Sequence, residues 1–123
     1  MKQSQKQILG KNGENIACKY LEKNGHEIIN RNYRKGRSEI DIISLDNSTL
    51  VVSEVKSFYA EPLGAAEFRV NKKKQQQIIQ GVYGFLGENP KYEGHDVRLD
   101  VIIVDFSEYP AKITHHQGAY HED

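Results

Sequence analysis

The chain of 123 residues has one cysteine, no tryptophan, only three prolines and no net charge. A single cysteine excludes an intramolecular disulfide and a zinc site built from several cysteines. Cys18 is therefore expected to be a small buried hydrophobic residue. Because 17 basic residues balance 17 acidic ones, bulk charge gives no argument for binding nucleic acid.

Long apolar runs are also missing. The aliphatic runs are short and interrupted by charge, so none can span a membrane, and the polar start Met1–Gln7 does not look like a secretory signal. We therefore expect a cytoplasmic protein. Without internal repeats or a Pro/Gly/Ser-rich linker, residues 1–123 are expected to form one domain with a core from about 8 to 120. A chain of this length buries about two-thirds of its unfolded surface.

Hydrophobic periodicity predicts the order helix, three strands, helix, two strands, and thus an α/β or α+β domain with helices on a mixed sheet. Pro62 and Gly64 lie in a stretch without clear periodicity, so Tyr59 to Arg69 is expected to be a mobile loop. The predicted ranges are helix Gln5–Asn24, strands His26–Tyr33, Glu39–Leu45 and Leu50–Ser57, helix Asn71–Leu86, and strands Val97–Val104 and Ala111–His115.

The second and third strands are predicted to form a β-hairpin that gathers acidic residues. Four turn formers, Asp46 to Thr49, separate the strands, a length that hairpins commonly use. Pairing of Leu45 with Leu50 then sets the antiparallel register. The pairs that follow are Ile43 with Val52, Asp41 with Glu54, and Glu39 with Lys56.

Facing carboxylates need compensation. At about 5 Å and an effective dielectric near 20, Asp41 and Glu54 would repel by roughly 3 kcal/mol. A divalent metal relieves this repulsion, because Mg²⁺ binds one or two carboxylates and leaves positions for phosphate oxygens. Lys56 follows Glu54 by two residues and shares its strand face, where it could hold an attacking water or neutralise charge at phosphorus.

A solvent-facing hairpin with an ordinary Glu–Lys pair is the competing interpretation. Aliphatic residues on both faces of the hairpin argue against it, because they indicate the centre of a covered sheet. We expect Ile43, Leu50 and Val52 on the acidic face and Ile40, Ile42, Val51 and Val55 on the other.

Two local clusters of basic residues are candidate contacts to phosphate, although such runs are also common on plain solvated surfaces. Lys72–Lys74 begin a predicted helix, where three lysines are unfavourable by about 0.3–1 kcal/mol each unless an anion lies there. Lys74 shares a helical face with Ile78 and Val82, so it is the lysine expected to point at the acidic residues. The other cluster consists of Arg31, Arg34, Lys35 and Arg37.

Several other charged residues remain open to a structural interpretation. Glu14 borders the apolar stripe of the first helix, where it is either a tolerated boundary residue or part of the site. Arg98 and Asp100 share a face of the late strand and are expected to pair with each other or with neighbouring charges. The C-terminal histidines lack a partner at metal-ligand spacing and are expected at the surface. They are His115, His116 and His121.

With these residues in place, the chain resembles the PD-(D/E)XK nuclease superfamily, which has a restriction-endonuclease-like αβββαβ core. It resembles more closely the YraN-type family of uncharacterised bacterial proteins, which are similar to archaeal Holliday-junction resolvases. The match runs from about Gly10 to Tyr120. The matching motifs are Gly10–Glu14 with Ala17 and Tyr20–Leu21, Asn30–Arg34, Glu39–Asp41, Glu54–Lys56, Val70 with Lys74, Arg98–Val101 and Ile113–Tyr120.

The resemblance implies an endonuclease that depends on Mg²⁺ or Mn²⁺ and hydrolyses DNA phosphodiesters, with branched DNA as a candidate substrate. It implies metal ligation by Asp41, Glu54 and the carbonyl of Val55, a catalytic role for Lys56, and a Glu14 that completes the acidic site. Resolvase-like relatives are often dimers, so a homodimer is a further expectation. The residues expected to grip DNA are Arg31, Arg34, Arg37, Lys72 and Lys74.

Three positions depart from the family's usual residues, and they keep two alternatives open. Ser38 replaces a glycine, Ser53 replaces an apolar residue, and Phe58 replaces an arginine that would contact phosphate. The lost arginine and the zero net charge support a catalytically silent DNA- or protein-binding module with the same fold. In the third interpretation, the acidic residues and Lys56 form only an internal ion-pair network.

Overall fold

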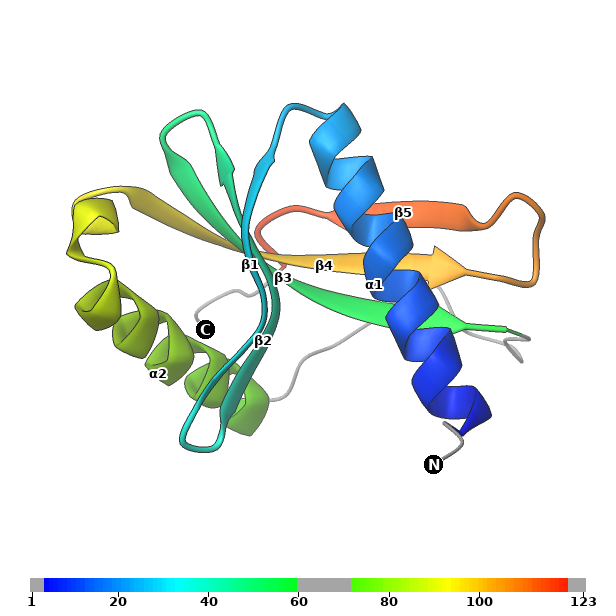
Figure 1. The fold of residues 1–123 in the computed structure, drawn as a ribbon, viewed down its shortest axis with the longest axis horizontal. Coiled ribbons are helices and arrows are strands. Elements are labelled where there is room, and N and C mark those ends of the chain that lie inside the picture. Colours follow the sequence, from blue (N-terminus) through cyan, green and yellow to red (C-terminus); the bar gives the residue numbers. More distant parts are fainter. Residues whose placement is uncertain (1–3, 60–71, 120–123) are drawn as a thin grey trace.

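A computed structural model describes residues 4–59 and 72–119 of the chain (Figure 1). The predicted mobile loop beyond Tyr59, the predicted helix start at Asn71 and His121 lie outside these residues. The order of elements is as predicted, with one short 3-10 helix added before the late strands. The elements are α1 (Gln5–Lys23), β1 (Glu27–Lys35), β2 (Ser38–Asp46), β3 (Thr49–Phe58), α2 (Lys72–Glu88), η1 (Pro90–Tyr92), β4 (Asp96–Asp105) and β5 (Lys112–His116).

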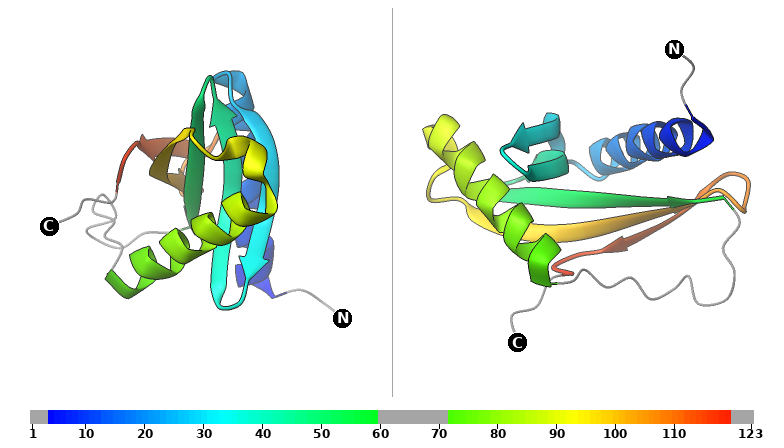
Figure 2. Two further views of the ribbon diagram at one scale, coloured as in Figure 1. Left: turned by 90° about the vertical axis from the view of Figure 1, so that its left-hand side faces the viewer. Right: turned by 90° about the horizontal axis from the view of Figure 1, so that it is seen from below.

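The five strands form one mixed sheet in the order β1-β2-β3-β4-β5, with β3 in the centre. Neighbouring strands are antiparallel except β3 and β4, which run parallel. A parallel pair needs a long crossover connection, and α2 lies in this one. The two helices cover opposite faces of the sheet, α1 on one and α2 on the other (Figure 2). This arrangement confirms the predicted α/β class and is consistent with a restriction-endonuclease-like core.

Local signals explain how α1 begins and ends. The Ser4 hydroxyl accepts a hydrogen bond from the Gln7 backbone N–H at 3.1 Å, and the Gln7 side chain accepts one from the Ser4 N–H at 2.9 Å. This reciprocal pair is a capping box. The helix ends at Lys23, and Gly25 then adopts a φ of 88°, which glycine tolerates without steric cost.

The two hairpins are tighter than predicted. Leu45 pairs with Leu50 as expected, but the β2–β3 ladder extends to Asp46 opposite Thr49. Only Asn47, with a φ of 55°, and Ser48 remain in the turn. The β1 strand likewise continues to Lys35, so Arg34 and Lys35 belong to the strand and not to the connection.

Each helix closes its own hydrophobic core against the sheet, and one predicted position is wrong. Ile40 was expected on the same face as Ile42, yet it lies in the α2 core, where a Cβ added to Gly81 would meet Ile40 Cδ1 at 3.1 Å. Strand alternation must break between Ile40 and Ile43, since both face α2 at an odd spacing. The α2 core comprises Ile40, Ile43, Leu50, Val52, Ile78, Val82 and Phe85. The α1 core comprises Ala17, Cys18, Leu21, Ile42, Ile102 and Val104.

Cys18 is buried as predicted, and this burial raises the pKa of its thiol. In the part of the chain that the structure describes, no helix is both long and apolar enough to cross a membrane.

Candidate functional site

A small pocket between the β2–β3 hairpin and α2 contains the predicted acidic residues. Its volume is about 10 Å³, which is room for about one water-sized group. Asp41 and Glu54 both line it, together with Lys74 from the first turn of α2. This agrees with the prediction that the two acids share one face of the hairpin and that Lys74 points at them. Glu39 is an additional acid that the sequence did not assign to the site. The lining residues are Glu39, Ile40, Asp41, Val52, Ser53, Glu54, Lys74 and Ile78.

Asp41 lies where the β2–β3 ladder stops. The last paired residues are Ile42 and Ser53, so the predicted facing pairs, Asp41 with Glu54 and Glu39 with Lys56, fall beyond the hydrogen-bonded ladder. The Val55 N–H donates instead to Asp41 Oδ2 at 2.9 Å. A side-chain carboxylate thus takes a backbone donor of β3, and the break in the alternation of β2 lies at the same place.

The environment of Asp41 opposes its ionisation. Burial is the largest cause, and the negative charges of Glu14, Glu54 and Glu39 add to it, whereas the hydrogen bond from Val55 acts in the opposite direction. Together they raise the pKa of Asp41 from its ordinary 3.8 to about 6. The expected repulsion among the acids is therefore present and only partly compensated by the protein.

Glu54 is nearly buried, with a side chain 10 % exposed, and it lies near two lysines from different elements. Lys56 Nζ on the same strand is 3.7 Å from Glu54 Oε1, and Lys74 Nζ from α2 is 3.9 Å from the same oxygen. The predicted places of both lysines beside the acidic residues are correct.

Glu14 lies on α1, which packs closely on β3, and it is not among the residues that line the pocket. A Cβ added to Gly13 would lie only 1.8 Å from Ser57 Oγ, so only glycine allows this approach. The carboxylate of Glu14 lies 4.0 Å from the Arg31 guanidinium, and its charge raises the pKa of Asp41. Glu14 therefore acts on Asp41 through its charge, and its part in the site stays a prediction.

Asn32 is a neighbour of Glu14 that the sequence did not single out. Its φ of 54° is left-handed within a strand, a conformation that asparagine tolerates better than most residues. With its amide oxygen and nitrogen exchanged, the Asn32 nitrogen donates to the two Glu14 oxygens at 3.1 and 3.3 Å. Arg31 also donates to Asn15 Oδ1 at 2.7 Å. The signal available in the sequence was the polar Asn30–Arg34 run in the middle of a strand.

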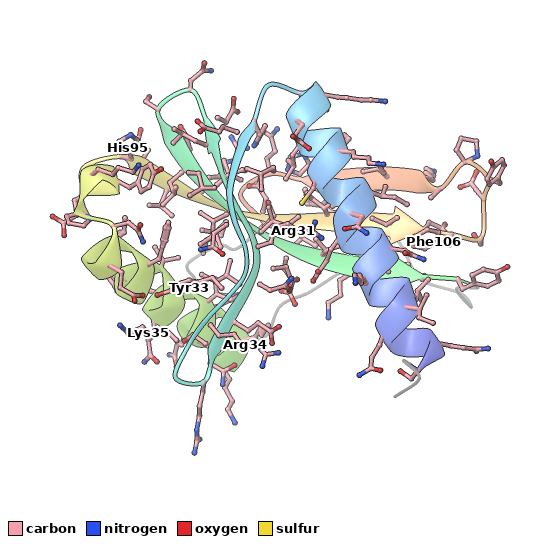
Figure 3. All side chains as sticks on the ribbon, viewed as in Figure 1. Arg31, Tyr33, Arg34, Lys35, His95 and Phe106 are labelled. Carbon is pink, nitrogen blue, oxygen red and sulfur yellow. The ribbon has the colours of Figure 1, made fainter. Side chains whose placement is uncertain are left out.

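Three of the predicted DNA-gripping residues lie within 4.0 Å of an acidic side chain, and these are Arg31, Arg34 and Lys74. Arg37 and Lys72 are exposed. Arg34 pairs with Glu39 at 3.3 Å and has a largely exposed side chain. Figure 3 shows Tyr33 and Lys35 on the α2 side of β1, where both contact Glu88, with Arg31 and Arg34 on the other side.

The donors at the pocket suit a hard cation, although a complete binding group is not assembled. Carboxylate oxygens of Asp41 and Glu54 are ligands that Mg²⁺ prefers. Among residues 4–59 and 72–119, no three His, Cys, Asp or Glu side chains come together as a ready metal-binding group. A metal here would therefore need waters or a phosphate oxygen among its ligands, which is usual for Mg²⁺.

A second charged cluster, built on Asp100, serves the fold. Asp100 is fully buried and accepts hydrogen bonds from Arg98 Nε at 2.9 Å, from His115 Nε2 at 2.7 Å and from the Gly118 N–H at 3.0 Å. His115 Nδ1 also lies 3.0 Å from the Tyr20 hydroxyl. Burial raises the pKa of Asp100, but these donors outweigh burial and hold its pKa below the ordinary value.

This cluster confirms the predicted Arg98–Asp100 pair and corrects the placement of His115. The His115 side chain was expected at the surface, yet it is only 8 % exposed. A buried carboxylate requires donors, and β5 supplies one because it pairs with β4 directly beside Asp100. His116 is exposed, as predicted.

One larger hollow lies elsewhere and does not compete as a site for phosphate chemistry. It is bordered by Ile8, Leu9, Tyr59 and Phe106, with Gln5 and Asn12 as its polar members. This lining holds neither acidic ligands nor basic groups, so it cannot supply acid–base or metal chemistry.

The element order, the mixed sheet and the acidic cluster at its central strand define an α/β domain consistent with a restriction-endonuclease-like core. The chain belongs to the uncharacterised protein family UPF0102, whose sequence profile matches residues 13–104. That range contains all four predicted catalytic residues, Glu14, Asp41, Glu54 and Lys56.

Three relatives illustrate the match. A UPF0102 protein of Treponema denticola is 35 % identical over 122 residues, which cover 91 % of this chain and 94 % of the relative. One of Chlorobium phaeobacteroides is 41 % identical over 96 residues, covering 78 % and 75 %. One of Chloroherpeton thalassium is 35 % identical over 99 residues, covering 80 % and 76 %.

Proposed function

We propose that this protein is a metal-dependent endonuclease of the PD-(D/E)XK type, which hydrolyses DNA phosphodiesters with Mg²⁺ or Mn²⁺. The observation that carries the proposal is the incompletely compensated acid Asp41 in one pocket with Glu54, beside Lys56 and Lys74. Acidic groups with strongly shifted pKa values in a cleft are typical of functional sites.

The metal would be held by Asp41 and Glu54, with the Val55 carbonyl as a third ligand. In an extended strand the N–H and C=O of one residue project to the same edge. Because the Val55 N–H points to Asp41, its carbonyl also faces the β2 side. A bound Mg²⁺ polarises a phosphoryl oxygen and lowers the pKa of an attacking water.

The remaining residues supply positioning and charge. Lys56, 3.7 Å from Glu54, orients the water or stabilises the developing negative charge at phosphorus. Glu14 completes the acidic set from α1. Contacts to the DNA backbone, with branched DNA as a candidate substrate, come from Arg31, Arg34, Arg37, Lys72 and Lys74.

The test combines metal binding with cleavage. Mg²⁺ and Mn²⁺ are titrated by calorimetry into the wild type, Asp41→Asn and Glu54→Gln, with Asp96→Asn as an exposed acid control on β4. The same proteins are then incubated with linear, single-stranded, flap and four-way junction DNA. We expect metal binding and cleavage in the wild type and the control, and loss of both in the two site variants. Absence of metal binding in the wild type and in every variant tested would refute the proposal.

A second candidate is a DNA-binding module without turnover. The two lysines within 4 Å of Glu54 favour it, because they already neutralise that carboxylate. Salt-dependent DNA binding that EDTA does not change, without cleavage of any substrate, is the result expected from such a module.

A further inference from the structure

Two lysine ammonium groups lie near Glu54, and they come from different secondary-structure elements. Lys56 belongs to β3 and shares a strand face with Glu54, so the strand holds its backbone next to that of Glu54. Lys74 reaches the same oxygen, Glu54 Oε1, from α2 across the pocket. The side chain of Lys74 is 41 % exposed, which leaves its ammonium in contact with solvent as well as with Glu54.

A divalent cation at Glu54 would conflict with the observed place of Lys74. The Lys74 Nζ is 3.9 Å from the oxygen that such a cation would bind. A cation bound to that oxygen at about 2.1 Å would lie within about 6 Å of the ammonium, where the two positive charges repel at the effective dielectric of a partly buried site. The pocket also has room for only about one water-sized group, so a hydrated ion would need lining side chains to move, and Lys74 is one of them.

A phosphate at the first turn of α2 would give the Lys74 ammonium an alternative partner. Lys74 lies in this turn, where the helix dipole favours anions and disfavours lysine. Lys72 and Lys73 precede it and are exposed. A phosphate bound at this turn would be favoured by the backbone N–H groups and by three ammonium groups.

We propose that Lys74 is a resident counter-ion of Glu54, together with Lys56, and that Lys74 leaves Glu54 for a substrate phosphate when a divalent cation binds. This inference rests on the proposed nuclease function and describes its regulation. Metal and DNA are then coupled through one side chain, because DNA draws Lys74 away from Glu54, where the metal binds, and the metal releases Lys74 for the phosphate. By linkage, metal tightens DNA binding by the same factor by which DNA tightens metal binding.

The first experiment measures Mg²⁺ affinity by calorimetry without DNA. Lys74→Met retains the apolar stem and removes the charge, Lys74→Arg retains the charge, and Lys73→Met removes an equal charge one residue away. We expect Lys74→Met to bind Mg²⁺ about tenfold more tightly than the wild type, within the usual range of couplings between sites. Lys74→Arg and Lys73→Met should remain close to the wild type. Equal affinities in Lys74→Met and Lys73→Met would overturn the inference.

The second experiment measures duplex DNA affinity in EDTA and in Ca²⁺, an oxygen-binding cation, with the integrity of the duplex checked on a gel. Lys74→Met should weaken DNA binding mainly in Ca²⁺, where the wild-type lysine is released. An equal loss in EDTA and Ca²⁺ would contradict the exchange. Metal binding that depends on Asp41 but not on Lys74 refutes this inference alone, whereas no metal binding by any variant refutes the proposed function as well.

Discussion

Asp41 and Asp100 lie on the two strands that flank β3, and their surroundings are opposite. Asp100 is fully buried and is surrounded by donors from Arg98, His115 and Gly118, which lower its pKa. Asp41 has one backbone donor and three neighbouring acids, and its pKa is raised to about 6. One fold thus contains a compensated aspartate and one that is only partly compensated.

Under the proposed function, the difference separates structural charge from functional charge. A buried carboxylate with all its partners is stable as an anion and holds the elements that supply the donors. An acid surrounded by other acids costs stability, and a fold retains such a cost where a ligand or a reaction uses it. The network on Asp100 joins β4, β5, α1 and the segment after β5, whereas the pocket at Asp41 is where the proposed function would place a cation.

Asp100→Asn should produce the largest loss of stability. It removes the negative charge that Arg98 and His115 share, and it leaves the Arg98 guanidinium without its carboxylate. We expect the free energy of unfolding to fall by about 3–5 kcal/mol, the usual cost of breaking a buried ion pair. Urea denaturation followed by circular dichroism measures the loss, with Asp96→Asn as an exposed control. An unchanged midpoint in Asp100→Asn would show that the network does not hold the fold.

Asp41→Asn should change the free energy of unfolding in the opposite direction and stabilise the protein. The asparagine oxygen still accepts the hydrogen bond from Val55, but the repulsion from Glu14, Glu54 and Glu39 is removed. Native Asp41 holds its proton up to about pH 6, whereas the unfolded chain releases it near 3.8, so wild-type stability declines as pH rises between these values. We expect the variant to be about 1–3 kcal/mol more stable at pH 7.5, with the difference fading towards pH 4.

Urea titrations at several pH values in EDTA measure this difference. Glu39→Gln is the matched control, because it removes the weakest of the three repulsive charges, so its gain should be smaller. A variant that is less stable than the wild type at pH 7.5 would mean that Asp41 is compensated as Asp100 is, and the comparison between the two aspartates would fail.

Much of this contrast was predictable from sequence, because it depends on local pattern and register. Apolar periodicity located both helices and all five strands, and the pairing of Leu45 with Leu50 follows from a short polar turn. Helical spacing also placed Lys74 on the inward face of α2, beside Glu54. Each of these inferences needs only neighbours in sequence or one hairpin.

The features that were missed depend on contacts between distant segments or on departures from regular geometry. His115 was expected at the surface because nothing near it in sequence shows that β5 pairs beside Asp100. Ile40 was assigned to the wrong face because alternation breaks where Asp41 replaces a backbone partner of β3. Hydrophobic periodicity also cannot reveal the left-handed backbone of Asn32, which lies beside Glu14, because this residue departs from regular strand geometry.

Gly13→Ala should cause a smaller loss of stability than Asp100→Asn. It should change the surroundings of Asp41 and not those of Asp100. The new methyl group would lie 1.8 Å from Ser57 Oγ and 3.1 Å from Ser57 Cβ, so rotation of the hydroxyl alone cannot relieve the clash. We expect a loss of about 1–3 kcal/mol in the free energy of unfolding, as in other overpacked cores. Gly10→Ala is the matched control, because a methyl group there meets nothing within 4 Å and alanine favours the helix.

Gly13→Ala should also change the pKa of Asp41, because Glu14 moves away from Asp41 when α1 moves away from β3. We expect this pKa, followed by NMR titration, to fall towards its ordinary value. A pKa of Asp41 that stays near 6 while stability falls would show that Glu14 acts on Asp41 less than its neighbours on the sheet do.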